Sequence, residues 1–197
     1  MRNRIVLVVA VTAVLLAGCG DNDSASETPG ASLAGSSVPA APDPPRDDSP
    51  DPGDDSPKQS TASSDAALTV TDIQLERGPG SDRVVYHLGG NGTPGWIVRY
   101  TDHAAQDGSG NPVDVSGRSI LEVRILGSTY PFDSGVAPYT GPDPVHDPEV
   151  PGIAGVYGST VFEGATQSFV GIQADHPAFT VRTMADPTRL VVDITRP

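Results

Sequence analysis

From residue 66 onward, hydrophobic side chains recur at every second position in short runs that Gly- and Pro-rich turns separate. The run at 119–126 is the clearest, because Leu121, Val123 and Ile125 alternate there with polar or charged residues. Successive side chains of a β-strand point to opposite faces, whereas a helix repeats every 3.6 residues, and no part of this chain shows such a repeat. The pattern predicts an all-β fold, an antiparallel β-sandwich of about nine short strands, with a barrel as the alternative.

The expected strands share this alternation and are bounded by turn residues. They lie at 68–75, 83–88, 95–100, 113–115, 119–126, 156–163, 169–173, 179–184 and 189–194. The alternation slips by one residue near Thr71 and Asp72, which indicates a β-bulge in the first strand. The runs RVVYHL at 83–88 and RLVVDI at 189–194 resemble one another, and a two-fold sandwich would place one of them in each sheet.

Residues 1–18 have the organisation of an export signal. Two arginines precede an apolar run at 5–16, whose length fits the ~7–15 residues of a secretory signal and is short of the ~20 that span a bilayer. The run ends in Leu-Ala-Gly-Cys at 16–19, which resembles the lipobox of bacterial lipoproteins. That resemblance implies cleavage after residue 18 and a lipid on Cys19. The alternative is an ordinary signal peptide with a chance cysteine.

Cys19 is the only cysteine of the chain, which excludes internal disulfides, thiol catalysis and cysteine-based metal sites from the domain. Residues 19–65 are expected to be a disordered tether, because they are rich in Asp, Pro and Ser and contain too little apolar surface to offset the entropy of ordering. We interpret them as a spacer between an anchor and a domain at 66–197, with low-complexity filler as the alternative. The domain has fifteen acidic residues against eight arginines. An acidic domain on an acidic tether is a poor partner for nucleic acid.

Four motifs in order suggest a family: DRVV at 82–85, GWIVRY at 95–100, DGSG at 107–110 and PTRLVVD at 187–193. With the signal, the lipobox and the acidic segment, they resemble the AMIN-like lipoproteins of high-GC Gram-positive bacteria. These are distantly related to the AMIN domain of N-acetylmuramoyl-alanine amidases. The resemblance covers about residue 68 to the C-terminus. It implies a β-sandwich without catalytic machinery that serves envelope targeting and peptidoglycan binding.

The residue types that could perform catalysis are scattered along the chain. His87, His103, His146 and His176 fall at no ligand spacing, and the Gly-x-Ser-x-Gly elbow of a serine hydrolase is absent from the sequence. Ser109 lies in a Gly-Ser-Gly segment that reads as a hairpin loop. We expect His87 to face solvent on the polar side of its strand. No catalytic residue and no cofactor are therefore expected.

Two acidic segments could bind a metal. The first has oxygen-bearing side chains at Asp107, Ser109, Asn111 and Asp114, near the alternation that Ca²⁺ loops use, but Pro112 stands where an EF-hand needs glycine. Hairpin-turn chemistry explains it better. The second consists of Asp143, His146, Asp147 and Glu149 among prolines, and we interpret it as a solvated loop. No metal site is expected.

Six residues are candidates for ligand binding. Three belong to the expected strand at 95–100, and three belong to a long Pro/Gly-rich loop at 127–152. The candidates are Trp96, Arg99, Tyr100, Tyr130, Phe132 and Tyr139. In a strand where it alternates with Val98 and Tyr100, Trp96 is more often a core residue than a binding residue. A loop of about 25 residues without regular structure is usually functional or disordered, so its aromatic side chains either bind a ligand or pin the loop to the sandwich.

These observations predict a non-catalytic binding protein of the cell envelope, extracytoplasmic and lipid-anchored through Cys19. Its expected partner is peptidoglycan or another wall glycan. One alternative is a scaffold that binds an envelope protein through an exposed strand edge or the long loop. The other is a small hydrolase that uses the Asp and His residues of that loop.

Overall fold

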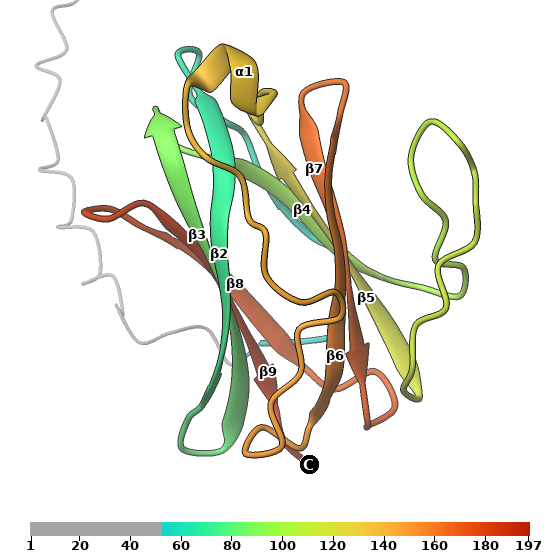
Figure 1. Cartoon of the computed structure of the whole chain (residues 1–197). Coiled ribbons are helices and arrows are strands. Elements are labelled where there is room, and N and C mark those ends of the chain that lie inside the picture. The colour runs from blue at the N-terminus through green and yellow to red at the C-terminus, as the bar shows by residue number, and fades with distance from the viewer. Residues whose placement is uncertain (1–52) are drawn as a thin grey trace, which may run out of the picture. The chain divides into compact units, whose positions relative to one another are not determined.

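The computed structural model describes residues 53–197, which fold into nine strands and one short helix (Figure 1). The strands of the first sheet are β1 (Lys58–Ser60), β4 (Gly95–Thr101), β5 (Ser119–Leu126), β7 (Ala165–Ile172) and β6 (Ile153–Phe162), in that spatial order. The strands of the second sheet are β2 (Ala67–Arg77), β3 (Ser81–Asn91), β9 (Arg189–Thr195) and β8 (Phe179–Met184), in that spatial order. The helix is α1 (Pro131–Ser134). All neighbouring strands are antiparallel, which confirms the expected sandwich.

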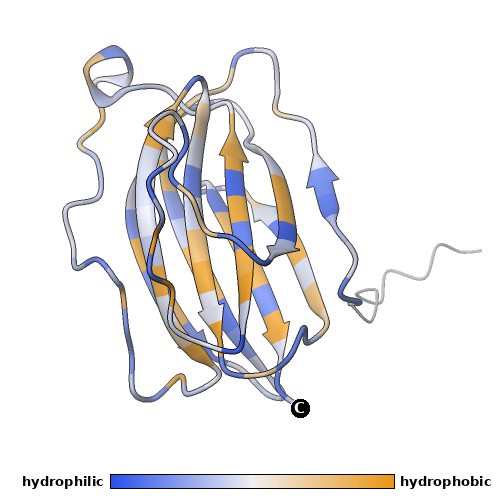
Figure 2. Ribbon diagram, turned by 90° about the vertical axis from the view of Figure 1, so that its right-hand side faces the viewer, coloured by the Kyte–Doolittle hydropathy of each residue, from blue (hydrophilic) through white to orange (hydrophobic). Residues whose placement is uncertain are grey.

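The core lies between the two sheets and is formed by the alternating positions that the sequence indicated. Along the strands, hydrophobic bands alternate with hydrophilic ones (Figure 2). Fully buried side chains come from both sheets and include Leu68, Val84, Tyr86, Val98, Leu121, Val123, Ile125, Phe179, Leu190 and Val192. Burying one such aliphatic or aromatic side chain contributes about 1.5–3 kcal/mol, so this layer supplies most of the stabilisation. Within residues 53–197, no helix is long and apolar enough to cross a membrane.

The predicted bulge in the first strand is confirmed. The register of β2 against β3 shifts between Val70 and Asp72, and Thr71 Oγ1 donates a hydrogen bond to the His87 carbonyl at 3.2 Å. One extra residue reverses the side on which later side chains point. Val70 and Ile73 are therefore both buried in the core, although three positions separate them.

The prediction of a strand at 113–115 is wrong, and the ninth strand is β1. Residues 102–118 form a loop over the outer face of the five-stranded sheet, where Val113 and Val115 pack against a buried cluster that includes Tyr157 and Phe169. Alternating valines at 113 and 115 thus reflect packing of a loop on a sheet. The loop has one bridge, between Ala105 and Pro112.

The boundary of the expected tether is also corrected. Residues 53–65, which we call the arm, belong to the folded domain: β1 pairs with β4, with Ser60 opposite Trp96, and Asp54 forms a bridge to Phe179 of β8. Backbone pairing with β4 stabilises this segment. Its polar side chains give no hydrophobic pattern from which the strand could be predicted. The rest of the expected tether, the signal and Cys19 lie outside the described residues.

The similar runs in β3 and β9 occupy one sheet, contrary to the expectation of one in each. The two strands are direct neighbours, with Arg83 opposite Asp193. Arg83 Nε lies 2.6 Å from Asp193 Oδ1, and Arg182 of β8 pairs with the same carboxylate. The similarity therefore reflects two adjacent strands that share a core face and an ion-paired outer face.

The loop at 127–152, which we call the strap, is ordered. It runs along the side of the sandwich between the edge strands β2 and β6 (Figure 1). Near its start Thr129 N donates to the Leu68 carbonyl at 2.8 Å, and further on Tyr139 N donates to the Val70 carbonyl at 2.8 Å. Val145 and Val156 of β6 then exchange two backbone hydrogen bonds of 2.8 and 2.9 Å. The strap thus covers both edges, while the arm joins β8 to β4 on the other side.

Candidate functional site

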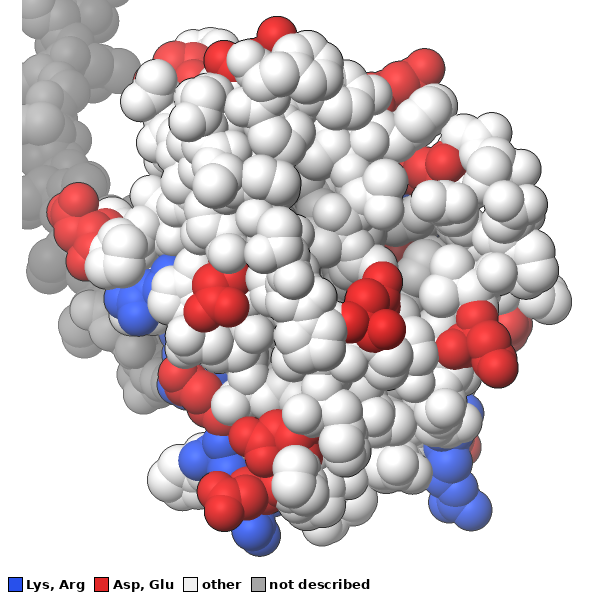
Figure 3. Space-filling view, viewed as in Figure 1, with Lys and Arg blue, Asp and Glu red and all other residues white. Residues whose placement is uncertain are grey.

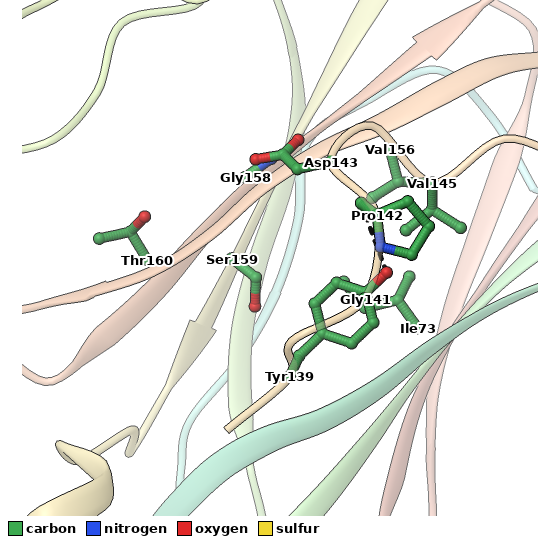
Figure 4. A pocket seen from close by; sticks show the side chains of 10 residues that line it. All are labelled: Ile73, Tyr139, Gly141, Pro142, Asp143, Val145, Val156, Gly158, Ser159 and Thr160. Atoms are coloured by element: carbon green, nitrogen blue, oxygen red, sulfur yellow. Dashed lines mark hydrogen bonds between the residues drawn. The ribbon is translucent and has the colours of Figure 1, made fainter. Parts of the chain in front are cut away.

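Three adjoining hollows lie beside residues 158–160 of β6, and together we call them the strap groove. The central one has a volume of about 200 Å³ and lies between Tyr139, Asp143 and the β6 residues Gly158, Ser159 and Thr160 (Figure 4). A second, of about 260 Å³, shares Ser159 and Thr160 and extends to Tyr130. A third, of about 190 Å³, shares Asp143, Gly158 and Thr160 with the central one and extends to Gln106 and Gln167. The three therefore form one shallow, elongated depression.

The groove exists because β6 is irregular where the strap leaves it. The register of β6 against β7 shifts between Tyr157 and Thr160, and Gly158 adopts φ 69°, a conformation that favours glycine. The freed Gly158 N–H donates a hydrogen bond to Asp143 Oδ1 at 3.0 Å. This contact holds the strap away from the strand at a fixed distance, and the bulge leaves backbone and hydroxyl groups open beside it.

Tyr139 forms the wall of the central hollow. Its hydroxyl donates to the Pro142 carbonyl at 2.9 Å, and its ring lies against Gly141, where a Cβ would stand 2.3 Å from the tyrosine oxygen. Burial raises the pKa of Tyr139, and the negative charges of Asp72 and Asp143 raise it further. The ring is thus held in one orientation within a negative potential.

Tyr130 and Phe132 form an exposed aromatic pair at the α1 end of the groove. Their ring centroids are 5.3 Å apart and their planes differ by 6°, so the rings are stacked. Phe132 is 80% exposed and Tyr130 is 40% exposed, and α1 buries no residue. Since burying an aromatic side chain is strongly favourable, a stacked pair left in solvent is more consistent with binding than with pinning the strap.

The opposite end of the groove is polar and rigid. Gln167 is buried on β7, where its Oε1 accepts from Asp107 N at 2.9 Å and its Nε2 donates to Glu122 Oε1 at 3.0 Å. Arg124 lies 2.8 Å from Asp107 Oδ2, and this bond raises the pKa of the guanidinium. Arg99 forms an ion pair with Glu122, with its Nε 2.9 Å from Glu122 Oε2, and it lines none of the three hollows.

Trp96 and Tyr100 lie on the arm side of the sandwich, away from the strap. Both pack partly against the core. Tyr100 donates its hydroxyl to the Pro177 carbonyl at 2.6 Å, and burial raises its pKa. Trp96 lines a cavity of about 420 Å³ that the arm residues Asp54, Lys58 and Gln59 share. The structure therefore brings Tyr130, Phe132 and Tyr139 together and separates them from Trp96, Arg99 and Tyr100.

The histidines and the acidic segments form no shared centre in the part of the chain that the structure describes. No group of three or more His, Cys, Asp or Glu side chains within 53–197 could hold a metal. His146 Nδ1 lies 3.2 Å from the Ala154 carbonyl, and His176 Nδ1 lies 2.7 Å from Asp175 Oδ1. His87 corrects the expectation of a solvated side chain: it is partly buried, and its buried Nε2 has no hydrogen-bond partner among the described residues.

Several groove residues carried no recognisable sequence signal. Ser159 and Thr160 become accessible only through the bulge of β6, and Gln167 stands between two other polar residues, Thr166 and Ser168, in β7. The lining includes no Lys or Arg, and Asp143 is its single carboxylate. The face in Figure 3 is hollowed, with Asp and Glu spread over it and Lys and Arg mainly at its left and lower margins. Aromatic rings, hydroxyls and amides without a basic residue suit a hydroxyl-rich ligand that carries no negative charge.

Comparisons with known proteins gave one match. A family model described as the AMIN-like domain matches residues 68–196. No curated protein and no solved structure is significantly similar to the chain. The matched span covers both sheets except β1, and it includes the strap and the groove.

Proposed function

The chain belongs to the AMIN-like domain family, whose members are associated with the extracytoplasmic cell envelope, and from this premise we propose that it binds peptidoglycan or another wall glycan in the strap groove without catalysing a reaction. The observation that carries the proposal is the exposed stacked pair of Tyr130 and Phe132 at one end of a groove with neutral polar walls. Aromatic rings offer apolar faces to sugar rings, and hydroxyls and amides match sugar hydroxyls.

The size of the groove favours a linear polymer. Small-molecule sites are usually concave pockets of ~300–1,000 Å³. Each of the three hollows is smaller, at about 200, 260 and 190 Å³, and all three share residues of β6. A chain of similar units can place one unit in each adjoining hollow, whereas a compact substrate would be poorly enclosed. The same shallowness argues against a hydrolase, because hydrolysis needs a site that positions water and excludes bulk solvent.

The proposed location rests on the sequence before residue 53. A lipid on Cys19 would hold the chain at the outer surface of the membrane, with the segment up to the arm as the spacer. The domain surface carries an excess of acidic residues, so attraction to anionic lipid would not assist the anchor.

A protein partner is the second candidate, and one observation favours it. The edges of β2 and β6 are covered by the strap, but β8 pairs with the arm through its backbone only at Phe179. Beyond that bridge, among the described residues, the outer edge of β8 has no pairing strand, and Met184 is 36% exposed. An extended segment of another protein could add to this edge.

A pelleting assay tests the glycan proposal. The full chain, kept in detergent, is mixed with purified insoluble peptidoglycan and centrifuged at low and moderate salt. We expect saturable, salt-tolerant pelleting that Phe132→Ala or Tyr130→Ala weakens by about 2- to 12-fold each, since an aromatic contact is worth ~0.5–1.5 kcal/mol. Met184→Ala is the matched control, because it removes an exposed hydrophobic side chain from β8.

Two outcomes would contradict the proposal. One is protein that stays in the supernatant at every salt concentration. The other is pelleting that the Phe132 and Tyr130 variants leave unchanged. Pelleting lost in Met184→Ala alone would also count against the groove, because glycan binding would then depend on the β8 edge.

A further inference from the structure

Asp143 is the one carboxylate in the lining of the strap groove, and only one of its two oxygens accepts a hydrogen bond from the described residues. Its Oδ1 accepts the Gly158 N–H at 3.0 Å, which fixes the orientation of the side chain. Its Oδ2 has no hydrogen bond or ion pair to any residue in 53–197, and the residue is exposed. A carboxylate held in one orientation, with one oxygen unpaired, is a ready acceptor for a charged donor.

An aromatic ring shares one hollow with Asp143. Tyr139 and Asp143 line the same hollow (Figure 4), and the tyrosine is held by its bond to the Pro142 carbonyl. Asp72 adds a second negative charge within electrostatic reach of Tyr139. An aromatic face and a carboxylate together form a favourable environment for an ammonium group, through cation–π attraction and a charge-assisted hydrogen bond.

The described protein offers no cation of its own to fill this position. No Lys or Arg lines any of the three hollows. The two arginines of the five-stranded sheet are already paired: Arg124 with Asp107 and Glu122, and Arg99 with Glu122. Asp143 is therefore available to a ligand.

We infer that the strap groove selects wall polymer that carries a free primary ammonium group, which Asp143 and the ring of Tyr139 receive. This inference rests on the proposed glycan binding and adds the chemical class of the group recognised. Two components of a peptidoglycan can supply that group: an amino sugar without its N-acetyl substituent, or the side-chain amine of a diamino acid in the stem peptide. Both present the same –NH₃⁺ to the groove.

Chemical acetylation of the peptidoglycan tests the inference. The full chain is pelleted with untreated material and with material whose free amines have been acetylated, both at low salt. Exposed ion pairs contribute ~0.2–1 kcal/mol, so acetylation should weaken binding by about 1.5- to 5-fold. Asp143→Asn should lower the affinity for untreated material by the same factor and bind both materials equally, since its amide oxygen can still accept the Gly158 N–H. Asp147→Asn, on the strap but outside the groove lining, is the matched control and should behave as the wild type.

The outcomes separate the inference from the proposal beneath it. Equal wild-type binding to untreated and acetylated material would overturn the ammonium preference and leave glycan binding standing. Failure to pellet with either would overturn both. Competition identifies the source: glucosamine oligomers against N-acetylglucosamine oligomers probe the sugar amine, and a stem peptide against its acetylated form probes the peptide amine. If neither amine-bearing competitor displaces the protein better than its acetylated counterpart, the inference is wrong.

Discussion

Gly95→Ala should detach the arm from the sandwich. Gly95 begins β4, and a Cβ at this position would lie 2.3 Å from Ala62 N and 2.8 Å from both Ser60 O and Thr61 C. Carbon atoms in proteins rest about 3.5 Å or more from their neighbours, so the arm backbone has to move by about 1 Å. A shift of that size breaks the pairing of β1 with β4, where Ser60 lies opposite Trp96.

The magnitude follows from overpacking. Forcing an extra carbon into a filled site costs about 1–3 kcal/mol. The free energy of unfolding should fall by that amount. The loss cannot exceed what the arm contributes to stability, because detachment of the arm relieves the clash. For a domain of this size the melting temperature should drop by about 2–12 °C.

Trypsin, which cleaves after lysine and arginine, provides an assay for the arm. Lys58 is the only lysine in the chain, and the next cleavage site after it is Arg77. In the wild type Lys58 lies in β1, and its Nζ donates to the Asp54 carbonyl at 3.0 Å. Cleavage after Lys58 requires the arm to open. A loss of 1–3 kcal/mol raises the open population, and so the cleavage rate, by about 5- to 150-fold.

Gly78→Ala is the matched control, because its Cβ would meet only the Ser81 Oγ at 3.2 Å and the serine carbonyl at 3.4 Å, outside the arm. It should leave cleavage after Lys58 unchanged. Rapid cleavage of the wild type at Lys58, or equal rates in Gly95→Ala and wild type, would refute the assignment of residues 53–65 to the fold.

Two further predictions concern the arm and the anchor. Hydrogen bonds from Lys58 and Ser56 lower the pKa of Asp54 to about 2 from its ordinary 3.8. Because the pKa is lower in the folded state than in the unfolded state, ionised Asp54 stabilises the folded arm. This stabilisation is complete above pH 3.8 and is lost as the pH falls through about 2. The fluorescence of Trp96, the only tryptophan, should therefore report an arm transition near pH 2 that is absent in Asp54→Asn, and a wild-type midpoint near pH 4 would contradict it. Cys19→Ser should leave the chain uncleaved or release it from the membrane fraction, measured by fractionation and mass; a mature form that still needs detergent would refute lipidation.

The inward faces of the strands could be predicted from the sequence because burial on one side imposes a two-residue period. Val84, Tyr86 and Leu88 on β3 illustrate this, and the slip at Thr71 located a bulge within one residue. β1 could not be found in this way. Its three residues, Lys-Gln-Ser, carry no hydrophobic signal, since the segment is held by backbone pairing with β4.

The site was predictable in its aromatic members only. Tyr130, Phe132 and Tyr139 drew attention because they stand in a long loop. Asp143 was noticed as part of an acidic segment, but its role as groove wall depends on the bulge at Gly158, which has no sequence pattern of its own. Trp96 and Tyr100 alternate with Val98 in the sequence, and this alternation cannot separate a core edge from a binding face.

The course of the arm determines where the domain would bear mechanical load. Any pull from an N-terminal anchor enters the sandwich through the Asp54–Phe179 bridge and the three pairs of β1, and each pair would open in turn from the end. The strap groove lies on the opposite side, between β2 and β6. Stretching between membrane and wall would therefore peel the arm first and expose Trp96, while a glycan strand stays held in an undistorted groove.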